Sequence, residues 1–284
     1  MAGLKKATVQ DELSKISDAI DQEEMRHIDL NTPVVDEDGF VRDVPLLAGY
    51  VDANGVLHDT FSYREMTGKD EEAISKADVR SNGAKLVNVL IERCVTSIGT
   101  LTKKECGSSW GSVIRNMLGG DLDYIAFKIR ELSKGNEVEF THKCPNCGQK
   151  LITIMNTDEF DIKPFKGQRE VDFTLIRGYR DMKGKIHKEG VLRLPNGYDR
   201  EIVVPLFRKN PSVAMTTLLT RCMTFNDGAF VNQQQVAEMS LRDREILENI
   251  IKENVFGVDT TIEGITCDNC GQELSGELGQ SNFF

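Results

Sequence analysis

The sequence predicts an α+β protein made of two tandem copies of one module, each a β-hairpin followed by helices and ending in a zinc-knuckle hairpin. Three observations predict this fold. A set of residues recurs in the two halves of the chain, a turn signal precedes the helical stretch in each half, and the pattern Cys-x-x-Cys-Gly-Gln occurs twice. Duplication of one supersecondary unit explains all three, because the copies keep the order of their elements.

Identical residues match between the two halves at one constant offset, without a gap. The pairs are Gly49 and Gly178, Tyr50 and Tyr179, Asp52 and Asp181, Gly55 and Gly184, His58 and His187, Arg64 and Arg193, Gly68 and Gly197, Asp70 and Asp199, and Glu72 and Glu201. The match predicts a first module over 36–163 and a second over 164–284, each near the usual domain size, and leaves residues 1–35 as an N-terminal helical arm. We expect pseudo-twofold symmetry between the modules.

The arm is predicted from Val9, Leu13, Ile16 and Ile20, which recur at helical spacing among polar residues within 5–28. This pattern is typical of an amphipathic helix with a narrow apolar stripe. The stripe either docks on its own chain or packs on another subunit.

Each module is then expected to open with a β-hairpin, because Asn54-Gly55 separates the apolar stretches 46–51 and 56–63 and Lys183-Gly184 takes the same place in the second half. Helices should begin near Asp70 and Asp199, break at Asn82-Gly83 and at Asn210-Pro211, and resume beyond each break. A further helix should begin at Asp121 in one half and at Ser240 in the other, with Gly135 and Gly257 as stops. Strands over 137–142 and 260–266 should lead into the knuckles.

The cysteine pairs predict a metal site. Cys144, Cys147, Cys267 and Cys270 supply the complete ligand set of a structural Zn²⁺, in which four sulfurs leave no open position for a substrate. We favour one zinc ion shared by both knuckles. Two local metals, each completed by His142 or by another cysteine, remain an alternative, as do metal-free knuckles or knuckles shared with another subunit.

Other conspicuous side chains favour structural roles. His58 and His187 recur without an acidic or nucleophilic partner at a convincing spacing, which favours hydrogen-bonded strand histidines. Cys94 and Cys222 each follow an arginine in an apolar helix and should be small buried side chains, while Cys106 has no match. Trp110 lies in a predicted loop, where it either covers its own core or anchors a contact.

Composition limits the function classes. Hydrophobic residues at 39% and charged residues at 28% are typical of a soluble protein. No apolar run approaches the ~20 residues of a membrane span. The polar N-terminus does not resemble a secretory signal. The net charge of −10 disfavours binding to a nucleic-acid backbone. No motif for nucleophilic, phosphate-binding or metalloprotease chemistry is present, so we expect no enzyme, no catalytic residue and no small-molecule substrate.

Several segments resemble the baseplate hub and tail assembly proteins of T-even-type tailed bacteriophages. The segments are 64–72, 120–125, 128–132 and 137–148 in the first half, and 194–197 and 240–245 in the second. The resemblance implies a non-enzymatic protein that acts in assembly of the tail-tip hub, as a structural component or as a hub assembly chaperone. It implies other tail and hub proteins as partners, the tape measure protein among them, a homo-oligomer as a further option, and a place in the host cytoplasm during assembly or in the virion tail.

A zinc-ribbon adaptor for nucleic acid or transcription is the alternative function. It would need a basic, aromatic surface around the knuckles, whereas Asp268, Asn269, Glu273 and Glu277 surround the second one. Phe283 and Phe284 at the end of the sequence either dock on the second module or insert into a neighbouring subunit.

Overall fold

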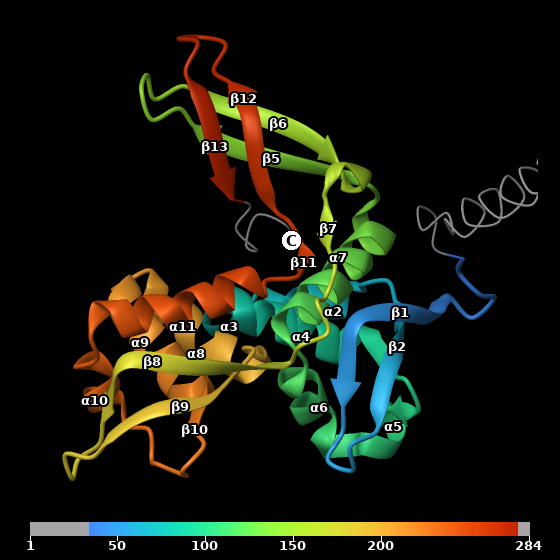
Figure 1. Cartoon of the computed structure of the whole chain (residues 1–284). Coiled ribbons are helices and arrows are strands. Elements are labelled where there is room, and N and C mark those ends of the chain that lie inside the picture. The colour runs from blue at the N-terminus through green and yellow to red at the C-terminus, as the bar shows by residue number, and fades with distance from the viewer. Residues whose placement is uncertain (1–33, 278–284) are drawn as a thin grey trace, which may run out of the picture. The chain divides into compact units, whose positions relative to one another are not determined.

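The computed structural model describes residues 34–277 (Figure 1). The chain divides into a small unit, Met1–Val34, and a large unit, Val35–Phe284, and the architecture below is that of the large unit. The predicted helix within residues 5–28 and the terminal Phe283 and Phe284 lie outside the described residues. The division of the large unit into modules 36–163 and 164–284 stays a prediction.

The mixed helix and sheet composition confirms the α+β class. The elements of the first half are β1 (Phe40–Val51), β2 (Leu57–Arg64), α2 (Gly68–Ile74), α3 (Ala77–Arg80), α4 (Gly83–Cys94), β3 (Val95–Ile98), β4 (Leu101–Thr102), α5 (Lys103–Cys106), η1 (Gly107–Ser109), α6 (Trp110–Asn116), α7 (Gly119–Lys134), β5 (Glu137–Lys143), β6 (Lys150–Asn156), η2 (Thr157–Glu159) and β7 (Ile162–Lys163).

The second half repeats much of this order. Its elements are β8 (Glu170–Arg180), β9 (Ile186–Arg193), α8 (Gly197–Phe207), α9 (Pro211–Cys222), β10 (Met223–Phe225), α10 (Gln233–Ala237), α11 (Leu241–Glu253), β11 (Gly257–Val258), β12 (Thr261–Thr266) and β13 (Glu273–Glu277).

Antiparallel pairing joins the strands of each half. The first half contains a sheet of order β1-β2-β3-β4 and the second a sheet of order β10-β9-β8, while β5-β6, β12-β13 and β11-β7 form separate two-stranded sheets. The predicted hairpin turns are present, because Asp52 Oδ1 accepts hydrogen bonds from the N–H groups of Asn54 and Val56. Asp181 Oδ1 does the same for Lys183 and Lys185.

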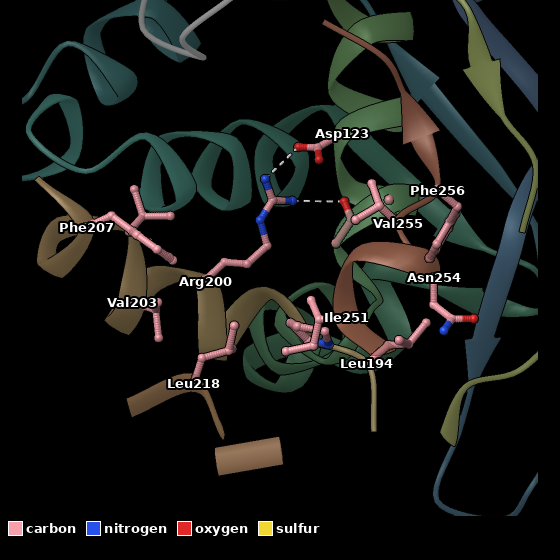
Figure 2. Close-up of a pocket in the computed structure, with 14 residues that line it drawn as sticks. Asp123, Leu194, Arg200, Val203, Phe207, Leu218, Ile251, Asn254, Val255 and Phe256 are labelled. Atoms are coloured by element: carbon pink, nitrogen blue, oxygen red, sulfur yellow. Dashed lines mark hydrogen bonds and ion pairs between the residues drawn. The ribbon is translucent and has the colours of Figure 1, made fainter. Parts of the chain in front are cut away.

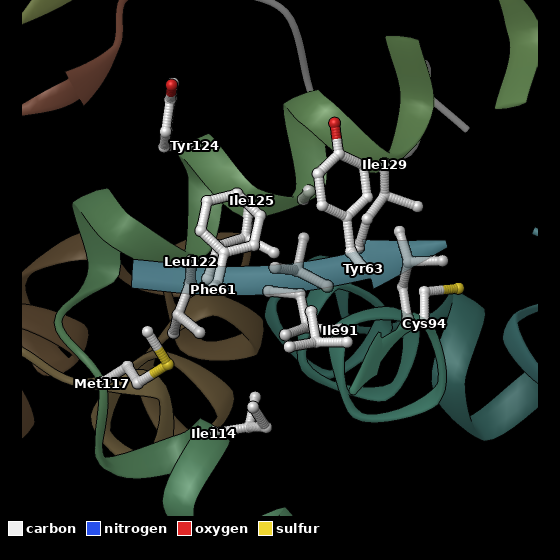
Figure 3. Close-up of a cluster of buried hydrophobic side chains, with 14 of the residues drawn as sticks. Phe61, Tyr63, Ile91, Cys94, Ile114, Met117, Leu122, Tyr124, Ile125 and Ile129 are labelled. Carbon is white, nitrogen blue, oxygen red and sulfur yellow. The ribbon is translucent and has the colours of Figure 1, made fainter. Parts of the chain in front are cut away.

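Each half has its own apolar core. In the first, side chains from β2, α4 and α7 converge, with Phe61 and Tyr63 stacked at 5.2 Å between ring centroids (Figure 3). In the second, Tyr179 and Phe225 stack at 5.0 Å among the apolar side chains of β9, α9 and α11. The prediction of a loop at Trp110 is wrong, because α6 begins at this residue. The indole is 2% exposed and covers its own core, the first one.

The predicted helix starts depend on a carboxylate in the third helical position. Asp70 and Asp199 each close a capping box at the start of α2 and α8, where the carboxylate accepts the N-cap N–H. Ser240 Oγ accepts the N–H of Asp243 at the start of α11, as its spacing predicted.

The predicted stop at Gly257 is wrong. Helix α11 ends at Glu253 with Asn254 as its C-cap, whose side-chain amide donates to Ile250 O at 2.8 Å. Gly257 lies in β11 with φ +105°, and a Cβ there would be 2.8 Å from Gly120 O. The glycine therefore permits close approach to the start of α7, and Asn254 ends the helix.

Helix α8 of the second half packs against α4 and α6 of the first. Glu201 Oε1 accepts hydrogen bonds from Asn88 Nδ2 at 2.8 Å and from Arg115 Nε at 2.9 Å. Asn82 Nδ2 donates to Glu201 O at 2.8 Å. Glu201 is thus the centre of a polar contact between the halves.

Over residues 34–277, no helix has both the length and the apolar character needed to cross a membrane.

Candidate metal centre

The two knuckle hairpins start from adjacent places because their connecting segments pair. Strand β7 follows the hairpin β5-β6, β11 precedes the hairpin β12-β13, and β7 pairs antiparallel with β11. An ion pair of 2.6 Å joins Lys163 Nζ to Asp259 Oδ2, and Asp259 N–H donates to Asp161 O at 2.8 Å. This short ladder brings the bases of the two hairpins together.

Helix α7 fixes the base of the first hairpin. Phe127, Val138 and Phe160 form a small buried cluster, with Phe127 and Phe160 edge to face at 5.9 Å. Arg130 donates to the backbone oxygens of Gly135 and Glu137, which end the helix and begin β5. The hairpin therefore leaves the helical core from a well-packed position.

The knuckle turns have the same hydrogen bonds in both hairpins. Cys144 N–H donates to Gln149 O and Cys267 N–H donates to Gln272 O, both at 2.9 Å. The glycine after each second cysteine donates back to the first cysteine's carbonyl and has a positive φ, 74° for Gly148 and 70° for Gly271. Glycine adopts this conformation without the steric cost that a Cβ would bring.

The structure brings together all four predicted cysteines. The sulfur atoms lie within 4.8 Å of one another, with Cys144 Sγ 3.6 Å from Cys270 Sγ and Cys147 Sγ 3.7 Å from Cys267 Sγ. Four sulfurs about 2.3 Å from one ion in a tetrahedron lie about 3.8 Å apart. The four cysteines can therefore bind a metal ion.

The four thiols differ in environment. Cys144 and Cys267 are buried, whereas Cys147 and Cys270 are exposed. Hydrogen bonds from the Asn269 side chain and the Gln149 backbone lower the pKa of the Cys147 thiol to about 6. Burial raises the pKa of the Cys267 thiol to about 11. A coordinated cation would favour the thiolate at every position, since thiols lose their protons on binding a metal.

The recurring histidines are buried strand residues with hydrogen-bond partners, as predicted, but the expectation that they lack a recurring acidic partner is wrong. Asp52 Oδ2 lies 3.6 Å from His58 Nε2, and the matched Asp181 lies beside His187. His187 is buried on β9, with Nδ1 2.7 Å from Asp227 Oδ2 and Nε2 3.3 Å from Asp181 Oδ2. His58 is buried on β2, with Nδ1 3.4 Å from Thr100 Oγ1. Neither ring lies in the cysteine cluster. Each histidine instead holds a turn to its own sheet, through Thr100 in the first half and through Asp181 and Asp227 in the second.

The matched pairs Arg64 and Arg193 and Asp70 and Asp199 belong to an ion cluster around a buried aspartate in each half, which sequence reasoning did not find. Asp70 binds Arg64 and Arg93, each at 2.7 Å, and Asp199 binds Arg193 at 2.6 Å and Arg221 at 2.7 Å. Burial opposes ionisation of Asp199, but its hydrogen bonds, chiefly from Arg193, lower the pKa of the carboxyl. The signal was present, because aspartates and arginines recur together at both places.

Burial confirms the interpretation of Cys94 and Cys222, which lie beside these clusters at 0% and 1% exposure. Burial raises the pKa of the Cys94 thiol to about 11 and that of the Cys222 thiol to about 12. Both cysteines therefore stay protonated and act as small packing groups.

A cavity of about 280 Å³ lies between α8, α11 and the start of α7 (Figure 2). Its walls are mainly apolar, with Val203, Phe207 and Phe256 among them. Arg200 enters it, donating to Gly119 O and to Asp123 Oδ1, both at 2.9 Å. This arginine is already engaged by the protein, and the cavity is separate from the four cysteines.

A family model described as T4 bacteriophage base plate protein matches residues 52–284. The chain belongs to this family. Comparisons with curated proteins and with solved structures give no match. The family assignment confirms the resemblance and supports a structural role in the phage base plate, with other tail proteins as partners. The match also covers all four cysteines of this base plate protein, so the candidate metal centre lies within the family region.

Proposed function

We propose that this base plate protein is a permanent structural component at the hub of the tail tip, and that Cys144, Cys147, Cys267 and Cys270 hold one structural zinc ion. The observation that carries the zinc proposal is the convergence of sulfurs from both hairpins within 4.8 Å. An ion bound there ties the hairpin of the first half to that of the second. Structural zinc sites of this kind contribute ~10 kcal/mol or more of binding free energy.

One shared ion is favoured over two local ions. The short sulfur distances, 3.6 Å and 3.7 Å, each join a cysteine of one hairpin to a cysteine of the other. Two local ions would instead need extra ligands beside each pair. Cys94 and Cys222 are buried in the helical cores, and they belong to the ion clusters there.

We further propose that the halves arose by duplication, with modules over 36–163 and 164–284. The repeated turns, capping boxes, ion clusters and knuckles support this proposal. The sulfur pairs Cys144–Cys270 and Cys267–Cys147 exchange under a twofold rotation, which supports pseudo-twofold symmetry at the knuckles. Twofold symmetry of the whole halves would require α9 and α2, the equivalents of α4 and α8, to pack on each other as α4 and α8 do. Within residues 34–277 no comparable packing joins α2 to α9, so we restrict the symmetry to the knuckles.

Metal analysis tests the zinc site. Purified wild-type chain should contain one zinc per chain by elemental mass spectrometry. Cys147→Ser should lose most of it, whereas the control Cys106→Ser, which changes a free cysteine outside the cluster, should keep it. A metal-free wild type, or two ions per chain, would contradict a single shared site.

Composition of purified phage particles tests the place in the virion. A permanent hub component should be present at a fixed ratio to other tail proteins, whereas a hub assembly chaperone would occur only in infected-cell lysate. Nucleic acid that remains bound to the purified protein until nuclease treatment would instead favour the adaptor function. The net charge of −10 argues against that outcome.

A further inference from the structure

Strand β6 has an open edge. It pairs along its whole length with β5, from Lys150 opposite Lys143 to Asn156 opposite Glu137, and this sheet has only two strands among the described residues (Figure 1). The N–H and C=O groups of alternate residues on its far side therefore face away from β5. Proteins usually protect such an edge with charges, prolines or bulges, because it is a template for another strand.

Beyond Lys150, its first residue, this edge lacks those protections. Residues 151–156 contain no charge and no proline, and the register with β5 runs without a bulge. Ile152 is 59% exposed and Ile154 is 61% exposed, both on the same face of the sheet. A regular apolar edge of this length is well suited to pair with a further strand.

The charges at the two ends of the hairpin indicate which strand fits. Lys143 and Lys150 lie opposite each other at the end near the knuckle, and Glu137 lies opposite Asn156 at the base. The short helix Thr157–Glu159 adds two carboxylates beyond the base. Within this hairpin one end is therefore basic and the other acidic, so antiparallel pairing of two β6 strands brings opposite charges together, whereas parallel pairing brings like charges together.

We propose that β6 pairs antiparallel with β6 of a second copy of this chain, joining two hairpins into one sheet of order β5-β6-β6-β5. The register that pairs the whole strand is centred on Thr153, which lies opposite Thr153 of the partner subunit. Ile152 then lies opposite Ile154 of the partner subunit, and Lys150 lies opposite Asn156 of the partner subunit. Four isoleucines form a continuous apolar strip on one face, and no directly opposed β6–β6 pair has like charges.

Sedimentation velocity of the purified full chain over a range of protein concentrations tests this dimer. The wild type should form a reversible dimer. Ile152→Lys and Ile154→Glu should each weaken it by roughly tenfold or more in Kd, because each places a charge against isoleucine at two symmetry-related positions. The double variant should recover dimerisation, because the new ammonium groups then face the new carboxylates.

The control is Ile186→Lys on β9, where the side chain is 46% exposed on another hairpin. It should leave the dimer unchanged. Since all three side chains are exposed in the monomer, the variants should unfold at nearly the wild-type temperature. A monomeric wild type, a double variant as weak as the single ones, or equal loss in the Ile186 variant would overturn the pairing. Zinc content measured on the same samples separates this result from the proposed metal site.

Discussion

Asp121 and Asp243 lie in the matching helices α7 and α11, but the pKa of the Asp121 carboxyl is raised and that of the Asp243 carboxyl is lowered. Asp121 is fully buried, and its Oδ1 accepts the N–H groups of Leu47 at 2.8 Å and Ala48 at 3.0 Å. Its Oδ2 has no hydrogen-bond partner within the described chain. Burial therefore raises the pKa of the Asp121 carboxyl to about 6, against the lowering effect of these N–H groups and of Arg169.

Asp243 is also fully buried, yet both of its oxygens are well supplied with donors. The backbone N–H groups of Ile176, Arg177 and Gly178 donate to it at 2.6 to 3.2 Å, and Ser240 Oγ donates at 2.9 Å. Burial opposes ionisation, but these hydrogen bonds lower the pKa of the Asp243 carboxyl. Folding thus favours ionised Asp243 and disfavours ionised Asp121.

We therefore predict that Asp121→Asn stabilises the protein near pH 8. A folded pKa of about 6 against a reference value of 3.8 corresponds to about 3 kcal/mol of stability lost on ionisation. The folded state binds the Asp121 proton more tightly, so this loss develops as the pH rises from about 4 to about 6 and is complete above. Asparagine avoids it and keeps the accepting oxygen.

The matched variant Asp243→Asn should instead lower the free energy of unfolding by roughly 2–4 kcal/mol, because an amide N–H₂ would face backbone donors. Urea unfolding of both variants and the wild type between pH 4 and pH 8 measures the difference. The gain from Asp121→Asn should be near zero at pH 4 and about 1–3 kcal/mol at pH 8. A gain that does not change with pH, or equal losses in both variants, would refute the reasoning.

Two further predictions concern the metal and the backbone packing. Removing the proposed zinc ion with a strong chelator should lower the melting temperature and increase amide exchange in the hairpins β5-β6 and β12-β13 before the helical cores, and added zinc should reverse both effects. Gly190→Ala should cost roughly 1–3 kcal/mol in chemical denaturation, because the new Cβ would be 2.2 Å from Thr224 O and 2.6 Å from the Phe173 ring. The control Gly68→Ala, which meets no atom within 4 Å, should change stability by less than about 0.5 kcal/mol.

Local signals in the sequence predicted much of the fold. The Asn54-Gly55 turn and its match at Gly184 marked the hairpins, and the residues Asp70 and Ser240 marked helix starts, because turns and caps depend on a few neighbouring residues. The predicted helix stop at Gly257 was wrong because it, too, was based on neighbouring residues alone. A glycine can serve a turn or a close approach, and only the distant Gly120 decides between them.

The four cysteines of the candidate site could be predicted from the sequence, but the way the fold brings them together could not. Cysteine spacing identified all four sulfurs, since the ligand chemistry is local to each knuckle. The ladder β7-β11 is two residues long on each strand, too short to give a periodic pattern. The contact of Glu201 with Asn88 and Arg115 joins residues far apart in the chain and likewise left no local signal.

The two shortest sulfur–sulfur distances join cysteines that are far apart in the chain. Cys144 and Cys270 are 126 positions apart, and Cys147 and Cys267 are 120 positions apart. A ribosome must therefore synthesise both halves before this cluster can close. A product truncated before Cys267 carries only the first pair of thiols, however well its leading half is folded.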